Sequence, residues 1–437
     1  MKVAIYWFRN DLRLADNPAL SLAAREADRL LCIYCHPAAA ESRWGFARVG
    51  PHRRHFLRDA LDDLARNLRA AGNALIEIEG DAATLLPQWI RTCGAGCLFC
   101  ESINAPEELA EVERLQSAGV DVRPLWQSTM LCPADLPFSP AQLPDVFTVF
   151  RQAVEKAITL PALSLPPVQK LPAAPAPGLD QALKDHLVRQ DSPAAEIAAP
   201  ATASGVSSFP YRLPAFMGGE TAASAHLQRY FSGGLAGTYK ETRDQLSGTA
   251  YSTKFSPYLA LGCISARQVY TALKAYEAAR GANQSTYWIW FELLWRDYFR
   301  FLHFKYGRAL YRSGGLNDAP PCAHDAAAFA RWCRGETGEP LVDAAMHELA
   351  ATGYLSNRLR QVAASYLIYD LGCDWRAGAA WFEAQLVDYD VYSNQGNWLY
   401  IAGRGTDPRG GRRFNPVKQA QEHDARGRYR ALWSSPL

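Results

Sequence analysis

The apolar segment at residues 286–301 places the carboxylate of Glu292 among tryptophans. Glu292 has Trp288 four residues before it and Trp295 three residues after it. A carboxylate in such surroundings is costly unless it is paired or neutral. Two interpretations stay open: Glu292 pairs with Arg296 one helical turn later, or its carboxyl group lines an aromatic pocket in which Trp295 stacks on a base.

A hydroxyl-rich turn at residues 252–256 (STKFS) precedes the apolar segment 258–262. Backbone N–H groups, three hydroxyl groups and Lys254 together suit a diphosphate. Serine and threonine are also common at helix N-termini that bind nothing, so an ordinary helix cap is the alternative.

Polar residues cluster twice more towards the C-terminus, at Asn357, Arg358, Arg360 and Gln361, and at Asp388, Asp390 and Asn394 before Trp398. The second group is either a set of turn residues that closes a helix or a set of anchors for a heterocycle. The stretch 404–418 adds five basic residues, which form a solvated loop or track phosphates.

The composition bounds the class of protein. The chain has 437 residues, of which 49% are hydrophobic, so a large soluble core is expected and intrinsic disorder is excluded. The net charge is +2, so any nucleic-acid site must be a local basic patch. The N-terminal residues resemble no signal peptide, and no segment approaches the length of a membrane span. We expect a cytoplasmic protein without membrane contact.

Ten cysteines raise the question of a metal site. Two pairs have C-x-x-C spacing, Cys32 with Cys35 and Cys97 with Cys100, but each pair lies in a segment that reads as a strand. Residues three apart on a strand point to opposite faces, so neither pair can easily chelate one ion. We expect reduced core thiols and no metal.

The first 130 residues alternate strand and helix patterns. Strands are predicted at residues 3–8, 30–35, 74–78, 96–100 and 120–122, and helices at residues 18–28, 51–71, 82–92 and 107–118. This order predicts an α/β domain with a Rossmann-like parallel sheet. No G-x-G-x-x-G follows the first strand, so the dinucleotide fingerprint is missing.

The rest of the chain changes character twice. Residues 161–204 are rich in proline and alanine, which predicts a linker with one short helix at 179–189. Helices are predicted at 221–231, 265–279, 286–306, 343–351, 356–369 and 377–387. We therefore expect an α/β domain at 1–150, an interdomain linker at 151–216 and an all-α domain at 217–437.

Many motifs along almost the whole chain resemble the cryptochrome/photolyase family, and more specifically its DASH branch. They include WFRNDLR at 7–13, the 252–262 segment, 291–301, 352–360 and NWLY at 397–400. The resemblance implies an N-terminal antenna-binding domain and a C-terminal helical domain that binds FAD and DNA.

The resemblance also implies roles for the polar clusters. The FAD phosphates and ribityl chain would contact Tyr239, Ser252, Thr253, Lys254, Phe255 and Ser256. Arg360 and Asp388 would form a salt bridge beside the isoalloxazine ring, Asp390 would meet the polar edge of the ring, and Asn394 would face N5.

The same resemblance places Glu292, Trp295, Asn357 and Arg358 around a cyclobutane pyrimidine dimer. Repair of (6-4) lesions is disfavoured, because the histidines of that photolyase type are replaced here by Asn357 and Gln361. Gln361 and Tyr400 stand where conventional dimer photolyases carry Met and Trp. Flipping a dimer out of a duplex costs a few kcal/mol, which a single strand avoids. A more polar pocket therefore favours lesions in single-stranded or looped DNA.

A second chromophore is implied, 5,10-methenyltetrahydrofolate as a light-harvesting antenna. Glu101 would bind its pterin-like head, and Tyr400 and Arg412 would contact it from the helical domain. The alternative for Glu101 is a solvated charge at a strand end.

Electron transfer to the flavin departs from the family pattern. Trp398 matches the proximal member of the usual three-tryptophan chain and Trp375 the middle one, but Cys322 occupies the distal position. We expect less efficient flavin photoreduction than in relatives with three tryptophans, with an exit through a nearby Tyr or Trp left open.

The leading hypothesis is light-dependent repair of pyrimidine dimers in single-stranded DNA by a monomer, with weaker binding of RNA or duplex DNA left open. The alternative is a blue-light receptor that binds FAD and nucleic acid with little turnover. Nothing resembles a hydride-transfer site, so a light-independent oxidoreductase finds little support.

Overall fold

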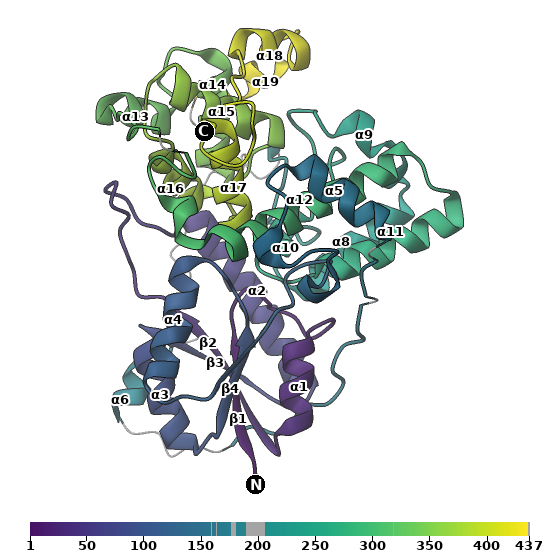
Figure 1. Cartoon of the computed structure of the whole chain (residues 1–437), viewed down its shortest axis with the longest axis vertical. Coiled ribbons are helices and arrows are strands. Elements are labelled where there is room, and N and C mark those ends of the chain that lie inside the picture. Colours follow the sequence, from purple (N-terminus) through teal and green to yellow (C-terminus); the bar gives the residue numbers. More distant parts are fainter. Residues whose placement is uncertain (159, 163, 176–180, 189–205, 318, 436–437) are drawn as a thin grey trace.

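The structure, a computed structural model, describes all residues except 159, 163, 176–180, 189–205, 318 and 436–437. An α/β domain lies below a helical domain in Figure 1. The sheet consists of β1 (Val3–Phe8), β2 (Arg29–His36), β3 (Leu75–Glu79), β4 (Cys97–Glu101) and β5 (Val122–Leu125). All its pairings are parallel and its strand order is β3-β2-β1-β4-β5. The predicted parallel α/β fold is confirmed.

Helices cover both faces of this sheet: α1 (Pro18–Glu26), α2 (Pro51–Ala70), α3 (Ala82–Cys93) and α4 (Pro106–Ser117). The side chains of β1 alternate between two cores because successive strand residues point to opposite faces. Tyr6 and Phe8 belong to the core that also contains α1 and α2, whereas Ile5 and Trp7 pack in a second core with α3. Both faces of β1 are therefore buried, as a sheet covered on two sides requires.

The cysteine pairs follow the same alternation. Cys32 lies in the first core and Cys35 in the second, so the two thiols point away from each other. Burial raises the pKa of both, which favours the neutral thiol. In the described part of the chain, no cluster of three or more His, Cys, Asp or Glu side chains could hold a metal ion.

Helices make up the second domain. They are α5 (Phe147–Lys156), α8 (Glu220–Ser232), α9 (Tyr239–Thr242), α10 (Ser256–Ala260), α11 (Ala266–Arg280), α12 (Gln284–Tyr306), α13 (Ala326–Arg334), α14 (Pro340–Thr352), α15 (Asn357–Tyr369), α16 (Trp375–Gln385), α17 (Val391–Ala402), α18 (Pro416–His423) and α19 (Arg428–Leu432). Short 3-10 turns lie at Pro133–Asp135, Pro140–Gln142, Leu235–Thr238 and Gly307–Tyr311. None of the helices in these described residues combines the length and apolar character needed to cross a bilayer.

All six helices predicted in this region are present, with shifted ends. The sequence did not predict α5, α9, α10, α13, α17, α18 or α19, and at the start of α17 its polar residues left a turn and a set of ligand anchors both open. The last predicted strand lies slightly later than expected, as β5. The linker helix predicted at 179–189 is reduced to α6 (Gln181–Asp185) among the described residues, and 179, 180 and 189 lie outside them.

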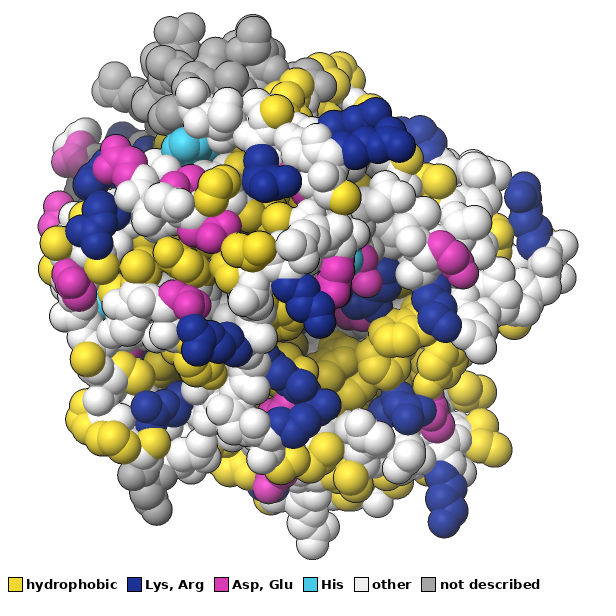
Figure 2. Space-filling model, turned by 90° about the horizontal axis from the view of Figure 1, so that it is seen from above, with side chains coloured by type: hydrophobic (Ala, Val, Ile, Leu, Met, Phe, Trp, Pro, Cys, Tyr) yellow, Lys and Arg dark blue, Asp and Glu magenta, His cyan; other side chains and the backbone are white. Residues whose placement is uncertain are grey.

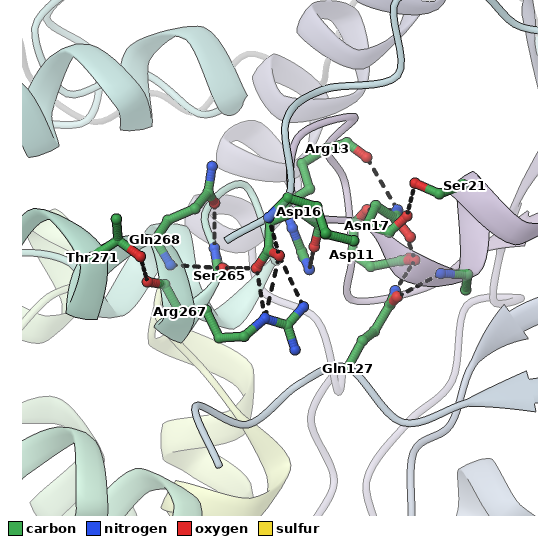
Figure 3. A network of polar contacts seen from close by, with 12 residues as sticks. Asp11, Arg13, Asp16, Asn17, Ser21, Gln127, Ser265, Arg267, Gln268 and Thr271 are labelled. Atoms are coloured by element: carbon green, nitrogen blue, oxygen red, sulfur yellow. Dashed lines mark hydrogen bonds and ion pairs between the residues drawn. The ribbon is translucent and has the colours of Figure 1, made fainter. Parts of the chain in front are cut away.

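The loop after β1 fastens the two domains together (Figure 3). Asp16 is fully buried and accepts hydrogen bonds from the Arg267 guanidinium at 3.0 Å and from the Ser265 hydroxyl. The Arg13 guanidinium donates to the carbonyl of Gly262 at 3.0 Å. A Cβ at Gly262 would lie 2.0 Å from the backbone oxygen of Asn10, so the backbones touch where only glycine fits.

Candidate functional site

The predicted phosphate turn has a strained backbone and a buried cation. Ser252 and Lys254 have φ angles of 57° and 56°, in the left-handed region that non-glycine residues rarely adopt. The Lys254 ammonium is buried 3.2 Å from the centroid of the Tyr251 ring, and among the described residues it has no hydrogen-bond partner. Burial lowers its pKa well below the usual value. A buried ammonium without an acceptor is costly, so this turn suits an anionic group.

A salt bridge lies between α15 and the residues before α17. The Arg360 guanidinium donates to Asp388 Oδ2 at 2.8 Å and to the carbonyl of Leu355 at 3.0 Å. Asp388 is buried, and its Oδ1 has no hydrogen-bond partner within the described chain. The predicted pair therefore exists, and it leaves one carboxylate oxygen able to accept from a ring N–H. Both orphaned atoms, Lys254 Nζ and this oxygen, fit the demands of FAD.

The start of α17 holds the other two predicted flavin residues. Asp390 caps the helix and pairs with Arg300 at 2.9 Å. Burial alone would raise the pKa of Asp390, but the nearby Arg300 and Arg296 charges lower it below the usual value. The Asn394 amide donates to the carbonyl of Ala379 at 3.0 Å, which fixes its orientation.

Glu292 does not pair with Arg296, so the helix-pair interpretation is wrong. Its carboxylate binds the Arg243 guanidinium at 2.5 Å, whereas Arg296 donates to the carbonyls of Ser128 and Leu259. Burial raises the pKa of Glu292, and the charge of Arg243 opposes that rise. The carboxyl group is thus held by the residue that follows α9 rather than by a residue of its own helix.

Arg243 and its neighbour Asp244 join two predicted clusters. Asp244 accepts from Arg358 at 3.1 Å, and Arg358 also donates to Gln361 at 3.2 Å. Residues 243–244 therefore connect Glu292 on α12 with the start of α15, where Asn357 lies. No role was assigned to Arg243 from the sequence, although its place one turn after Tyr239 puts both on one helical face. Its guanidinium lies 5.8 Å from the Tyr239 ring centroid.

Trp295 is already stacked on one side. The Phe147 ring lies 3.7 Å away at an interplanar angle of 11°, and Tyr400 approaches at 6.1 Å. These three rings line a cavity of about 390 Å³ that also contacts Arg409. Phe147 was not predicted as a site residue, and the only signal was its i, i+3 spacing with Phe150 on α5. Seen from above, the helical domain has a hollow lined by hydrophobic side chains and bordered by Lys and Arg side chains (Figure 2).

The three predicted antenna residues lie in two places. Arg412 packs over the Tyr400 ring at 5.0 Å and pairs with Asp407 at 3.0 Å. Glu101, at the end of β4, lines a separate and much smaller cavity of about 10 Å³ with Arg300. It is not a solvated charge, because it is 2% exposed and its Oε2 finds no partner among the described residues. Burial first, and then the Asp11 charge, raise its pKa to about 8.

The predicted electron-transfer residues are buried. Trp398 and Trp375 are 2% and 1% exposed. The Trp375 indole N–H and the Cys322 thiol both approach the carbonyl of Ser313, at 3.1 and 3.8 Å. Cys322 therefore lies beside Trp375, where the next member of the chain was expected.

Two family profiles match the chain. Residues 4–176 match the DNA photolyase domain, and residues 288–437 match the FAD binding domain of DNA photolyase. A Cryptochrome DASH of Synechocystis sp. is 43% identical over 444 residues, which cover 99% of this chain and 87% of the relative.

Solved structures agree. The crystal structure of the Synechocystis sp. PCC6803 cryptochrome superposes with a TM-score of 0.90 at 41% identity, over 99% of this chain and 88% of that one. A bacterial class III photolyase from Agrobacterium tumefaciens superposes with a TM-score of 0.80 at 29% identity, over 99% and 86%. With both photolyase domains and these matches along its whole length, the chain belongs to the light-dependent cryptochrome/photolyase family, in its DASH branch.

Proposed function

We propose that this protein repairs cyclobutane pyrimidine dimers in single-stranded or looped DNA, in a light-dependent reaction that uses reduced FAD. The observation that carries the proposal is the connection through residues 243–244. It joins Glu292 and Arg358, the proposed lesion contacts, to the ring of Tyr239, a proposed FAD contact, which supports a single site for lesion and cofactor.

FAD would be held by the two orphaned groups. The buried Lys254 ammonium and the surrounding backbone suit the diphosphate, and Asp388, oriented by Arg360, can accept from the ring. The bound flavin would supply the excited electron donor. Asn394, fixed by its bond to Ala379, offers a neutral amide that tolerates an anionic ring.

The lesion would lie against Trp295, whose second face is free of the Phe147 stack. The carboxyl group of Glu292 and the amide of Asn357 would bind the base edges, while Arg358 contacts a phosphate. A pocket with Gln361 and Tyr400 gives a flipped dimer less apolar contact than Met and Trp would. This supports a preference for single strands, which need no flipping from a duplex.

We also propose a methenyltetrahydrofolate antenna near Glu101. A neutral carboxyl group can both donate to and accept from a pterin, and its raised pKa favours that form. The cavity beside Glu101 is too small for a pterin ring, so Arg300 or a neighbouring side chain would have to move when the folate binds. Glu101→Gln should lose the near-ultraviolet folate band after reconstitution and retain the flavin bands. Equal folate binding by the variant would contradict this assignment.

A blue-light receptor that binds FAD and nucleic acid with little turnover is the alternative. One measurement distinguishes a repair enzyme from a receptor: whether dimers in an ultraviolet-damaged oligonucleotide are lost when the protein is illuminated with blue light. A receptor would bind the oligonucleotide and leave the dimers intact.

The site is tested by comparing Glu292→Gln with a surface control, Glu336→Gln, whose partner Arg334 is exposed. We expect Glu292→Gln to lower dimer repair at least tenfold, which corresponds to about 1.4 kcal/mol of lost transition-state stabilisation. The control should repair at the wild-type rate. Equal rates for both variants, with FAD bound in each, would overturn the assignment of Glu292.

A further inference from the structure

A continuous row of aromatic rings leads from Trp398 to the surface of the other domain. Phe382 lies 5.2 Å from Trp398, and Trp332 lies 6.0 Å from Phe382 and 6.5 Å from Trp398. Phe329 follows at 6.0 Å from Trp332, and Trp44 at 6.4 Å from Phe329. We call these five residues the aromatic ladder.

The inner residues of the ladder are buried, and its outer end is partly exposed to solvent. Trp332 is fully buried and Phe329 is 7% exposed, whereas Trp44 is half-buried. Trp44 belongs to the loop between β2 and α2, so the ladder crosses from the helical domain into the α/β domain. Three of its members are tryptophans, whose indole rings lose an electron more readily than phenylalanine rings do.

We infer that this aromatic ladder carries electrons from the surface to Trp398 when the flavin is photoreduced, with Trp44 as the outer donor. The inference rests on the proposed FAD function. It assigns a role to Trp44 and Trp332 that the usual three-tryptophan chain does not contain.

The electrons and protons of the route balance. The photoexcited oxidised flavin is the acceptor, and each electron that it gains leaves Trp398 as a radical cation. Trp332 refills Trp398, and Trp44 refills Trp332 by tunnelling past Phe329. Trp44 then loses its indole proton to water, and a soluble thiol reductant later returns one electron while water returns the proton.

The hydrogen bonding of each indole suits its place in the sequence of steps. The Trp332 N–H donates to the carbonyl of Ala363 at 3.1 Å, a neutral acceptor that does not remove the proton. The positive charge on Trp332 therefore stays mobile and passes outward. At the half-exposed Trp44, water can take the proton, which traps the oxidised state at the surface.

The route from Trp398 through Trp375 ends in a residue that is harder to oxidise than tryptophan. Beyond Trp375 lies the Cys322 thiol, which is partly buried. A thiol gives up an electron less readily than an indole does, so Cys322 is a poorer outer donor than Trp44.

Arg43 opposes oxidation of Trp44, because its guanidinium lies 4.7 Å from the centroid of that ring. A positive charge over the ring disfavours a second positive charge within it. Arg43 is exposed, so solvent and salt screen the effect. Arg43→Gln should make Trp44 easier to oxidise and raise the yield of its radical about twofold.

The test is a flash experiment on the FAD-loaded protein, with Trp44→Phe and Trp332→Phe variants and Trp126→Phe as a control that removes a tryptophan outside the ladder. The yield of long-lived tryptophan radical should fall at least fivefold in both ladder variants and stay unchanged in the control. Mass spectrometry after illumination without added thiol should find oxidised Trp44 in the wild-type protein.

A second indole at position 322 provides the rescue. Cys322→Trp in the Trp44→Phe background should restore the radical yield by opening the branch through Trp375. A wild-type yield in Trp44→Phe, with unmodified Trp44 in the illuminated wild-type protein, would overturn the inference. Failure of the wild-type protein to bind FAD would instead overturn the proposed function, and the flavin absorption of each sample separates the two outcomes.

Discussion

Two of the buried carboxylates at the interface between the two domains, Asp16 and Glu101, differ in every partner. Asp16 accepts hydrogen bonds from Arg267 and Ser265 (Figure 3). It also accepts one from the backbone N–H of Leu165. Glu101 is equally buried, but one of its oxygens has no partner among the described residues and its pKa is raised to about 8.

The difference in hydrogen bonding indicates a structural role for Asp16 and a functional role for Glu101. A buried carboxylate whose bonds are all made rigidifies the structure around it, and the Asp16 network holds the loop after β1 against α11. A buried carboxylate without partners is costly in the folded protein and is usually kept for a ligand or for chemistry. The first group should therefore control stability, and the second should control pH dependence and binding.

The largest effect is expected at Asp16. Asp16→Ala leaves the largely buried Arg267 guanidinium without its partner, and it places alanine at a φ angle of 49°. Breaking a buried pair in this way costs about 3–5 kcal/mol, so the free energy of unfolding measured in urea should fall by that amount. Asp16→Asn keeps the shape and tolerates the backbone angle, and should lose less. A loss below about 1 kcal/mol in the alanine variant would contradict the fastening role, because that is the range of an exposed pair.

A smaller and pH-dependent effect is expected at Glu101. The folded protein keeps a proton on this group that the unfolded chain releases near pH 4.3. The stability that the proton contributes is complete below that pH and is lost as the pH rises to about 8. Between pH 5 and 8 the unfolding free energy of the wild type should therefore fall relative to that of Glu101→Gln, by up to about 1.4 kcal/mol per pH unit. Parallel pH profiles would show that Glu101 is ionised in the folded protein.

The smallest effect is expected at the rim of the same interface. Arg48 donates to Glu383 at 2.9 Å, and their side chains are 36% and 18% exposed. Glu383→Gln should cost up to about 1 kcal/mol, with less effect at high salt, because solvent screens such pairs. A cost as large as that of Asp16→Ala would remove the distinction between rim and buried network.

Strong periodicity allowed most of the fold to be predicted. The buried runs of β1 and β2, and the long apolar face of α12, specify their elements directly. At the start of α17 the sequence left a turn and a set of ligand anchors both open, because Asp390 and Asn394 are common in turns. Asp390 in fact caps the helix, and the pairing with Arg300 that stabilises it comes from a distant element.

The site was predicted in its residue types and only partly in its contacts. The Arg360–Asp388 pair exists as expected. The partner of Glu292 could not be found from local spacing, because Arg243 follows α9, far from Glu292 in the chain, and pairs with it in place of Arg296. The stack of Phe147 on Trp295 joins residues far apart in the chain, which no local pattern reveals.

Dimer repair under light tests the central claim most directly. Protein with fully reduced FAD is mixed with an oligonucleotide that carries one cyclobutane thymine dimer, as a single strand or in a duplex, and chromatography follows the dimer in blue light and in darkness. We predict loss of the dimer from the lit single strand at a rate at least tenfold above the duplex, and no loss in the dark. An intact dimer in the lit single strand, with FAD bound and the oligonucleotide bound, would contradict repair and favour the receptor.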